Sequence, residues 1–169
     1  EIIRCIEDNL GSGQWGEVTE KAKTMLVPPV TTKEKRIFIE REDALQSSLK
    51  MGCFVMDRHH PDFLKARVMV TLFGGYFGSR LMSNIREDKG YTYGIGAGIV
   101  SYPETGILTV STEAANEYVD SIITEVYREM DKLCNDLVPQ EELEMVKNYM
   151  LGDLCRSYEG PFSLSDAWI

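Results

Sequence analysis

The chain contains little of what a self-contained metal centre requires. It has only two histidines, His59 and His60, and they are adjacent in the sequence. Two helical side chains point to the same side only when they are three or four positions apart, so this pair cannot hold one ion from one helix face. We therefore expect no histidine-based metal site in this chain.

Cysteine is also sparse and shows no paired spacing. The four cysteines lie far apart and form no C-x-x-C pair, and they are Cys5, Cys53, Cys134 and Cys155. Three fall at apolar positions of the pattern, which predicts buried free thiols, because an unpaired cysteine behaves as a small hydrophobic residue. A zinc site formed by Cys53, His59 and His60 is the alternative, although structural zinc usually has two spaced ligand pairs.

Long runs of one charge or of apolar residues are missing as well. The net charge is −9, and no run of Lys or Arg is long enough to follow a phosphate backbone, which argues against a nucleic-acid partner. The apolar runs are far shorter than the roughly 20 residues that cross a bilayer, and Glu1 begins directly in a charged helical pattern. We expect no membrane insertion, and both cytoplasm and periplasm stay open as compartments.

What the chain does have is enough apolar sequence for one core. With 169 residues, of which 43% are hydrophobic, a single domain is expected. We assign residues 1–35 to an N-terminal helix and a proline-containing linker of this domain, with a further helix considered around residues 18–26. Residues 36–169 form its α+β part, which we expect to be truncated at the C-terminus because the last apolar helix ends with the chain.

The order of predicted elements defines the fold class. Strands are predicted at residues 36–40 and 45–56, a helix with Leu64, Val68 and Leu72 buried at 61–74, and a second strand pair at 91–100 and 107–112. A long helix capped by Asn116 and another helix beginning at Pro139 follow, and a last one begins at residue 162. This order predicts an α+β fold, with helices packed on one face of a mostly antiparallel mixed sheet.

The most informative segment is the short helix that ends at Gly90 and leads into a strand. Arg86 falls in the last turn of that helix, seven residues before Tyr93. Strict alternation places Tyr93 on one strand face with Tyr91, Ile95, Ala97 and Ile99. The opposite face is nearly bare, with Thr92, Gly94, Gly96, Gly98 and Val100. Strand glycines indicate the close approach of a ligand or backbone, and tight packing of a neighbouring helix is the alternative.

Residues 74–98 resemble zinc metallopeptidases of the pitrilysin and insulin-degrading enzyme type, which include the mitochondrial processing peptidase and the core proteins of respiratory complexes. The resemblance is carried by a Gly-Gly turn, Ser79-Arg80-Leu81, Ile85-Arg86-Glu87, Gly90 and Tyr93. It implies the α+β fold of that family over residues 36–169. In the family pattern, an arginine and a tyrosine at this spacing hold substrate near the metal, which makes Arg86 and Tyr93 the candidate catalytic pair.

The resemblance also implies what this chain leaves to another domain. The inverted H-x-x-E-H motif that binds zinc in this family is absent here. The chain is then a non-zinc, substrate-holding unit, with Gly94, Gly96 and Gly98 as candidate substrate-binding positions for a peptide or unfolded polypeptide. Zinc and the general base belong to an H-x-x-E-H domain of the parent polypeptide or of a partner subunit, and this chain alone is expected to have no activity.

Two other interpretations stay open. The chain can be a non-catalytic structural or interaction subunit of the same fold, like the family's core proteins, or an unrelated α+β binding domain. At the level of single residues, Arg86 can simply cap helix carbonyls or pair with Glu87 or Asp88, and Tyr93 can be a core aromatic residue.

Overall fold

The computed structural model of the protein describes residues 1–11 and 33–168 and divides the chain into two units, Glu1–Glu40 and Arg41–Ile169. In the first unit, helix α1 (Ile2–Ile6) continues as the wider helical turn η1 (Glu7–Gly11), which confirms the helix expected before Gly11. The helix considered at residues 18–26 lies outside the described residues. The assignment of residues 1–35 to the same domain as residues 36–169 stays a prediction.

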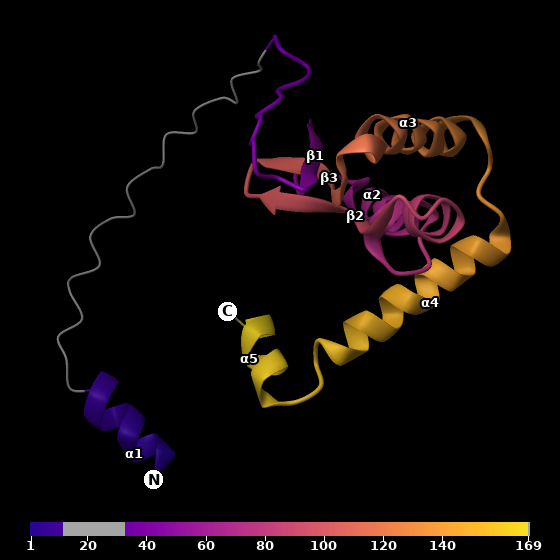
Figure 1. Ribbon diagram of the computed structural model, residues 1–169. Coiled ribbons are helices and arrows are strands. Elements are labelled where there is room, and N and C mark those ends of the chain that lie inside the picture. The colour runs from indigo at the N-terminus through magenta and orange to yellow at the C-terminus, as the bar shows by residue number, and fades with distance from the viewer. Residues whose placement is uncertain (12–32, 169) are drawn as a thin grey trace. The chain divides into compact units, whose positions relative to one another are not determined.

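The second unit contains a three-stranded antiparallel sheet (Figure 1). Its strands are β1 (Gln46–Val55), β2 (Thr92–Tyr102) and β3 (Thr105–Ala115), in the order β1-β3-β2. The predicted hairpin of β2 and β3 is confirmed, and so is the strand predicted at 45–56. The strand predicted at 36–40 is wrong: these residues form no strand and their apolar side chains are exposed, because no described strand pairs with them.

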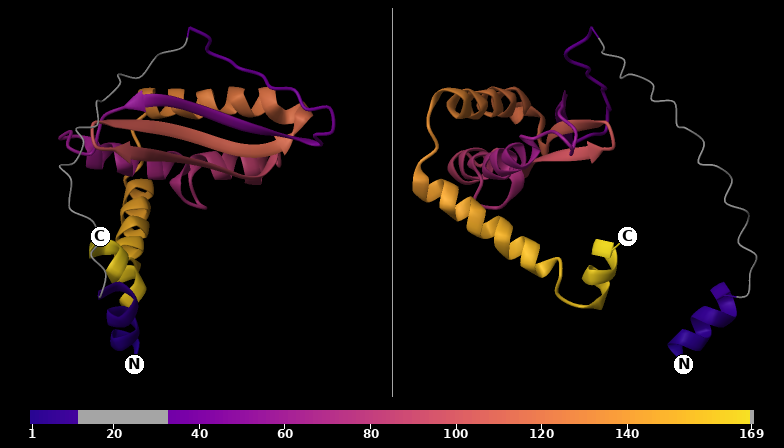
Figure 2. Two further views of the ribbon diagram at one scale, coloured as in Figure 1. Left: turned by 90° about the vertical axis from the view of Figure 1, so that its left-hand side faces the viewer. Right: turned by 180° about the vertical axis from the view of Figure 1, so that it is seen from behind.

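Helices follow the strands in the predicted order. They are α2 (Phe63–Val70), η2 (Thr71–Gly75), η3 (Met82–Asp88), η4 (Asn116–Tyr118), α3 (Val119–Asn135), α4 (Gln140–Arg156) and α5 (Pro161–Trp168). The helices η2, η3 and α3 pack on one face of the sheet, as the two views in Figure 2 make visible. The predicted α+β class, with helices on one face of an antiparallel sheet, is thus confirmed.

The core lies between these helices and the sheet. It consists of Phe73, Leu81, Met82, Ile85, Ile95, Val110, Ala114, Ile122 and Val126. Residues from η2, η3, α3 and two strands meet there, so the core fixes the position of η3 against the start of β2. Within the described ranges, we find no helix with both the length and the apolar character that a membrane span requires.

Three local expectations are wrong. Leu64 is exposed, because the buried side of this helical segment is formed by Val70 of α2 and Leu72 of η2. All four cysteines are free but exposed, and Cys53, although on the core-facing side of β1, lies beyond the buried part of an outer strand. Asn116 does not cap the following helix: its side-chain oxygen accepts a hydrogen bond from Ser47, and its amide donates to the carbonyl of Ala44.

Candidate functional site

The end of η3 brings Arg86 to the start of β2. Gly90 adopts the left-handed conformation, with φ of 65°, as the predicted glycine stop requires. Its N–H donates to the Arg86 carbonyl at 3.1 Å, and the N–H of Tyr91 donates to the Ile85 carbonyl at 3.0 Å. Because Ile85 is fully buried in the core, the turn holds the backbone of Arg86 in a fixed place.

The guanidinium of Arg86 lies over two aromatic rings. Its central carbon is 4.5 Å from the centroid of the Phe77 ring and 5.6 Å from that of the Tyr93 ring. A weak ion pair joins Arg86 to Glu87, with 3.9 Å between nitrogen and oxygen. The side chain of Arg86 is 28% exposed, and among the described residues it donates no hydrogen bond. The guanidinium therefore keeps donors available at the surface.

Tyr93 is exposed because β2 contains a β-bulge. Thr92 pairs with Ala114 and Ile95 with Thr112, so β2 uses one residue more than β3 between these pairs. Thr92 and Ile95 can then both be buried, and Tyr93 points outward with 92% of its surface exposed. The predicted face shared by Tyr93 and Ile95 is wrong, since strict alternation ends at the bulge.

Hydroxyl groups hold this bulge. The Oγ1 atoms of Thr92 and Thr112 lie 2.8 Å apart, and Thr112 donates to the Gly94 carbonyl at 2.8 Å. The N–H of Gly94 in turn donates to Thr92 Oγ1 at 3.2 Å. Both threonines are buried, so their hydrogen bonds satisfy polar groups that would otherwise be costly.

The strand glycines leave open surface. A Cβ added to Gly94 or Gly98 would meet nothing within 4 Å, and one added to Gly96 would meet only the Gly74 carbonyl oxygen at 3.7 Å. The position that does require glycine is Gly74, whose Cβ would lie 2.6 Å from the Cβ of Ala97. The close helix contact thus depends on the helical glycine, and Gly94 and Gly98 do not take part in it.

The sheet face opposite the helices carries small and polar side chains over its middle, and Phe54, Ile107 and Val100 lie on the same face toward one end. The register places Gly96 beside Ser111 and Gly98 beside Thr109. Ser111 in turn pairs with Lys50, and Ser111 and Lys50 are exposed. This surface, formed by Gly96, Gly98, Thr109, Ser111 and Lys50, is named the open sheet face below. Strand glycines of this kind often mark the close approach of a ligand or of another backbone.

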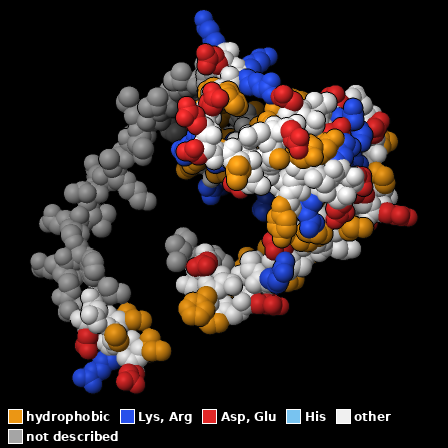
Figure 3. All heavy atoms as spheres, viewed as in Figure 1, with side chains coloured by type: hydrophobic (Ala, Val, Ile, Leu, Met, Phe, Trp, Pro, Cys, Tyr) orange, Lys and Arg blue, Asp and Glu red, His pale blue; other side chains and the backbone are white. Residues whose placement is uncertain are grey.

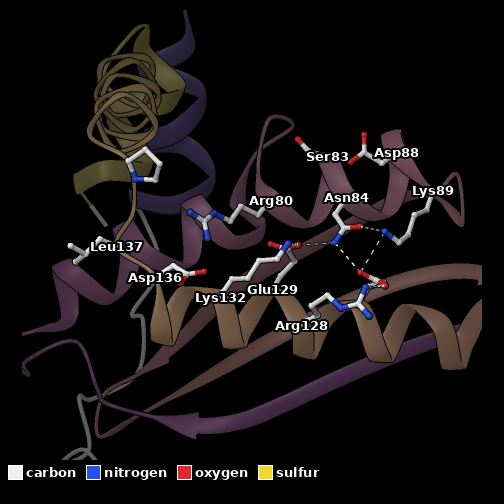
Figure 4. Close-up of a pocket in the computed structure, with 12 residues that line it drawn as sticks. Arg80, Ser83, Asn84, Asp88, Lys89, Arg128, Glu129, Lys132, Asp136 and Leu137 are labelled. Carbon is white, nitrogen blue, oxygen red and sulfur yellow. Dashed lines mark hydrogen bonds and ion pairs between the residues drawn. The ribbon is translucent and has the colours of Figure 1, made fainter.

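A polar network occupies the other side of η3. Asn84 donates from its amide nitrogen to Glu129 at 2.7 Å and Glu125 at 3.1 Å, and Lys89 donates to the Asn84 oxygen at 2.7 Å. Arg128 and Lys132 each contact one of these carboxylates at 2.7 Å. Figure 4 shows Asn84 of η3 and Lys89, which directly follows it, pointing toward the charged side chains of α3.

This network lines a polar groove of about 550 Å³. The side chains of Glu125 and Glu129 are only 9% and 5% exposed, and all their charge is matched by the neighbours named above. Burial raises the pKa of Glu125, but the Asn84 hydrogen bond and the charges of Lys89 and Arg128 outweigh it and leave that pKa below its ordinary value. The apolar pattern of the helix over 119–135 gave no signal for these two buried carboxylates.

The turn before η3 was also missed by sequence reasoning. The N–H of Ser79 donates to the Tyr76 carbonyl at 3.1 Å, which closes a turn that has Phe77 and Gly78 at its centre. Phe77 is 62% exposed and supplies the ring nearest to Arg86. Its signal in the sequence was only its place in the glycine-rich segment.

Among the described residues, no group of three or more His, Cys, Asp or Glu side chains is arranged to hold a metal ion. The alternative site of Cys53, His59 and His60 is therefore not formed.

On the face shown in Figure 3, Lys and Arg side chains are interspersed with Asp and Glu. The arrangement around Arg86 can donate hydrogen bonds to a carbonyl or carboxylate, and it provides a phenol beside that fork.

Comparison with known proteins defines the family. The pattern of the peptidase M16 inactive domain matches residues 1–150, and this chain belongs to that family. A zinc protease of Bacillus subtilis, YmxG, whose name marks it as uncharacterized, is 27% identical over 158 residues, which are 94% of this chain. The chain spans 37% of YmxG and 23% of similar Rickettsia zinc proteases.

Solved structures share the fold. The peptidase M16 inactive domain from Pseudomonas fluorescens is 27% identical and has a TM-score of 0.62, with 64% of this chain and 27% of that chain covered. A protease from Helicobacter pylori covers 99% of this chain with 41% of its own, at a TM-score of 0.75 and 15% identity. The predicted relationship to this peptidase family is confirmed, whereas the roles of Arg86, Tyr93 and the strand glycines stay predictions.

Proposed function

We propose that this chain is the substrate-holding, non-zinc domain of an inverted-motif zinc metallopeptidase. Arg86 and Tyr93 would contribute to a composite site that is completed by an H-x-x-E-H domain of the same polypeptide or of a partner subunit. The observation that carries the proposal is the pair itself, a half-buried arginine beside an exposed tyrosine: the two side chains come from different elements, and the guanidinium carbon lies 5.6 Å from the phenol ring centroid.

The chemistry of the pair supports two roles. The Arg86 guanidinium is a planar set of donors that suits a substrate carbonyl or carboxylate. Tyr93 carries a phenol, whose hydroxyl can donate a hydrogen bond to the oxyanion of a tetrahedral intermediate. Peptide hydrolysis also needs the zinc-bound water and a general base, which the catalytic domain would supply.

The open sheet face supports a polypeptide substrate. Gly96 and Gly98 carry no side chain, and Gly98 leaves free space where a Cβ would be. Gly94 lies in the bulge beside Tyr93, so an extended peptide along β2 would pass from the glycines to the phenol. We propose that Gly94, Gly96 and Gly98 line the path of this peptide.

The test is Tyr93→Phe in the full-length protein. The change removes one hydroxyl from a side chain that is 92% exposed, so thermal stability should stay within about 0.5 kcal/mol. Peptidase turnover should fall about 100-fold, the usual cost of one deleted oxyanion donor. The matched control is Tyr127→Phe, which makes the same change at an exposed position on α3.

Wild-type turnover in Tyr93→Phe would contradict the proposed role of the phenol. If the full-length protein hydrolyses no peptide even as wild type with zinc present, the remaining interpretation is a non-catalytic structural or interaction subunit. Metal analysis of the full-length protein is the control for this outcome. A preparation without bound zinc is inactive for that reason alone, so only a zinc-loaded protein without activity supports the non-catalytic interpretation.

A further inference from the structure

We propose that Phe77 is a positioning residue for Arg86, holding the guanidinium where it meets the substrate. This inference rests on the proposed function, because it assigns a role to Phe77 only if Arg86 binds substrate. It adds a third residue, from the turn before η3, to the pair suggested by the family pattern.

The contact geometry is the first support. The guanidinium carbon of Arg86 lies 4.5 Å from the Phe77 ring centroid, closer than the 5.6 Å to Tyr93. Guanidinium faces are attracted to aromatic rings, whereas the N–H donors lie in the guanidinium plane. A ring over the face therefore fixes the direction of the side chain and leaves its donors available.

The turn that carries Phe77 is firmly anchored. Tyr76, immediately before it, packs its ring 4.9 Å from that of Tyr149 on α4, and its hydroxyl lies 3.8 Å from the sulfur of Met145. A Cβ on Gly78 would lie 2.9 Å from the Tyr76 ring, so glycine is needed there for the ring to pack. The packed ring of Tyr76 thus constrains the backbone of the turn from which Phe77 projects.

Packing alone does not explain an aromatic residue at this position. Phe77 is 62% exposed, so it contributes little apolar burial to the core. Its ring is nevertheless placed against Arg86, whose guanidinium donates no hydrogen bond to a described residue. An aromatic residue held at the surface beside such a cation is consistent with orienting it.

Preorganisation gives the expected size of the effect. An arginine that is already ordered loses less rotamer freedom when substrate binds. An exposed cation–π contact corresponds to about a two- to five-fold change in an equilibrium constant. Phe77→Leu should therefore lower kcat/KM of the full-length enzyme by about three-fold, mainly through a higher KM.

The experiment is a double-mutant cycle in the full-length protein. Phe77→Leu, Arg86→Ala and the double variant are compared with wild type by kcat/KM on a peptide substrate. Phe77→Tyr keeps a ring and should retain wild-type KM, and Phe162→Leu on α5 is the control for loss of an exposed phenylalanine. If Phe77 acts through Arg86, Phe77→Leu has no further effect once Arg86 is alanine.

The outcomes separate the two proposals. Equal loss from Phe77→Leu in both backgrounds, or wild-type KM in Phe77→Leu beside an impaired Arg86→Ala, overturns the positioning role and leaves the proposed function intact. Full activity in Arg86→Ala overturns the proposed function, and this inference with it. The Nε–H resonance of Arg86, followed in protein with labelled arginine, should lose the larger part of its aromatic ring-current shift in Phe77→Leu, because Tyr93 is the more distant ring, and keep it in Phe77→Tyr.

Discussion

Charged side chains on the two sides of helix η3 have different surroundings. On the side facing α3, Asn84 and Lys89 meet the buried carboxylates Glu125 and Glu129, and each charge has a partner. On the side facing β2, Arg86 lies between exposed aromatic rings, and its nearest carboxylate is 3.9 Å away.

The comparison separates polar groups that hold the fold from polar groups that are available to a ligand. A buried network with every member satisfied stabilises the arrangement of η3 and α3, because removing any partner leaves a desolvated charge. Exposed aromatic contacts contribute little stability.

On the side of η3 that faces β2, Arg86→Ala should produce the largest change in activity. Loss of the guanidinium removes charge-assisted hydrogen bonds to substrate, so kcat/KM in the full-length protein should fall about 100-fold. The melting temperature should move little, because the guanidinium lies against exposed rings at the surface of the protein. Arg67→Ala, at an exposed position of α2, is the matched control and should leave both quantities unchanged. A large drop in stability would break the division.

On the side of η3 that faces α3, Asn84→Leu should have the opposite effect and lower the stability of the fold. The substitution keeps the branching of the side chain but leaves Glu125 and Glu129 without the amide donor, which should lower the free energy of unfolding by about 3 kcal/mol. Urea unfolding followed by circular dichroism measures the loss. Asn135→Leu, at the exposed end of α3, should have almost no effect, and equal losses in both variants would contradict the structural role of the network.

Substitutions at two glycines extend the comparison to the two faces of the sheet. Gly74 of η2 packs against the helix-covered face, and Gly98 lies on the open sheet face. Gly74→Ala should lower the free energy of unfolding by about 2 kcal/mol, because its Cβ would overlap Ala97. Gly98→Ala should stay within about 0.5 kcal/mol, as its Cβ enters open space. If the peptide follows the open sheet face, Gly98→Ala should raise KM instead. Calorimetry and kinetics on both variants decide between these effects.

The smallest effect concerns acid. The pKa of Glu125 is lowered in the folded protein, so its stabilisation is complete above the unfolded value of about 4.3 and is lost as pH falls through the folded value. Unfolding free energy should therefore decline below about pH 4.3. Glu125→Gln should make this decline shallower, as measured by urea titrations at a series of pH values. An unchanged slope would show that the carboxylate does not contribute.

Sequence reasoning predicted the elements that local chemistry determines. The stop at Gly90, the hairpin and the α3 stripe containing Ile122 and Val126 depend on backbone sterics and on apolar periodicity within one element. These features are encoded within short windows, so they could be predicted without knowledge of the partners.

The features it missed depend on residues far away in sequence. The bulge that turns Tyr93 outward needs Thr112 on β3, and the burial of Glu125 needs Asn84 on η3. Residues 36–40 have a strand pattern but no described neighbour to pair with. In each case a tertiary contact, or its lack, overrides the local pattern.

The threonine pair beneath the bulge has a consequence for how sequence variation in this domain is interpreted. Thr92 and Thr112 determine which way the chain turns at Gly94, although neither carries the phenol. Replacing Thr112 by valine would preserve shape and remove the hydroxyl that holds the Gly94 carbonyl. A relative can therefore retain Tyr93 in an alignment and yet have lost its outward orientation through a change on the adjacent strand.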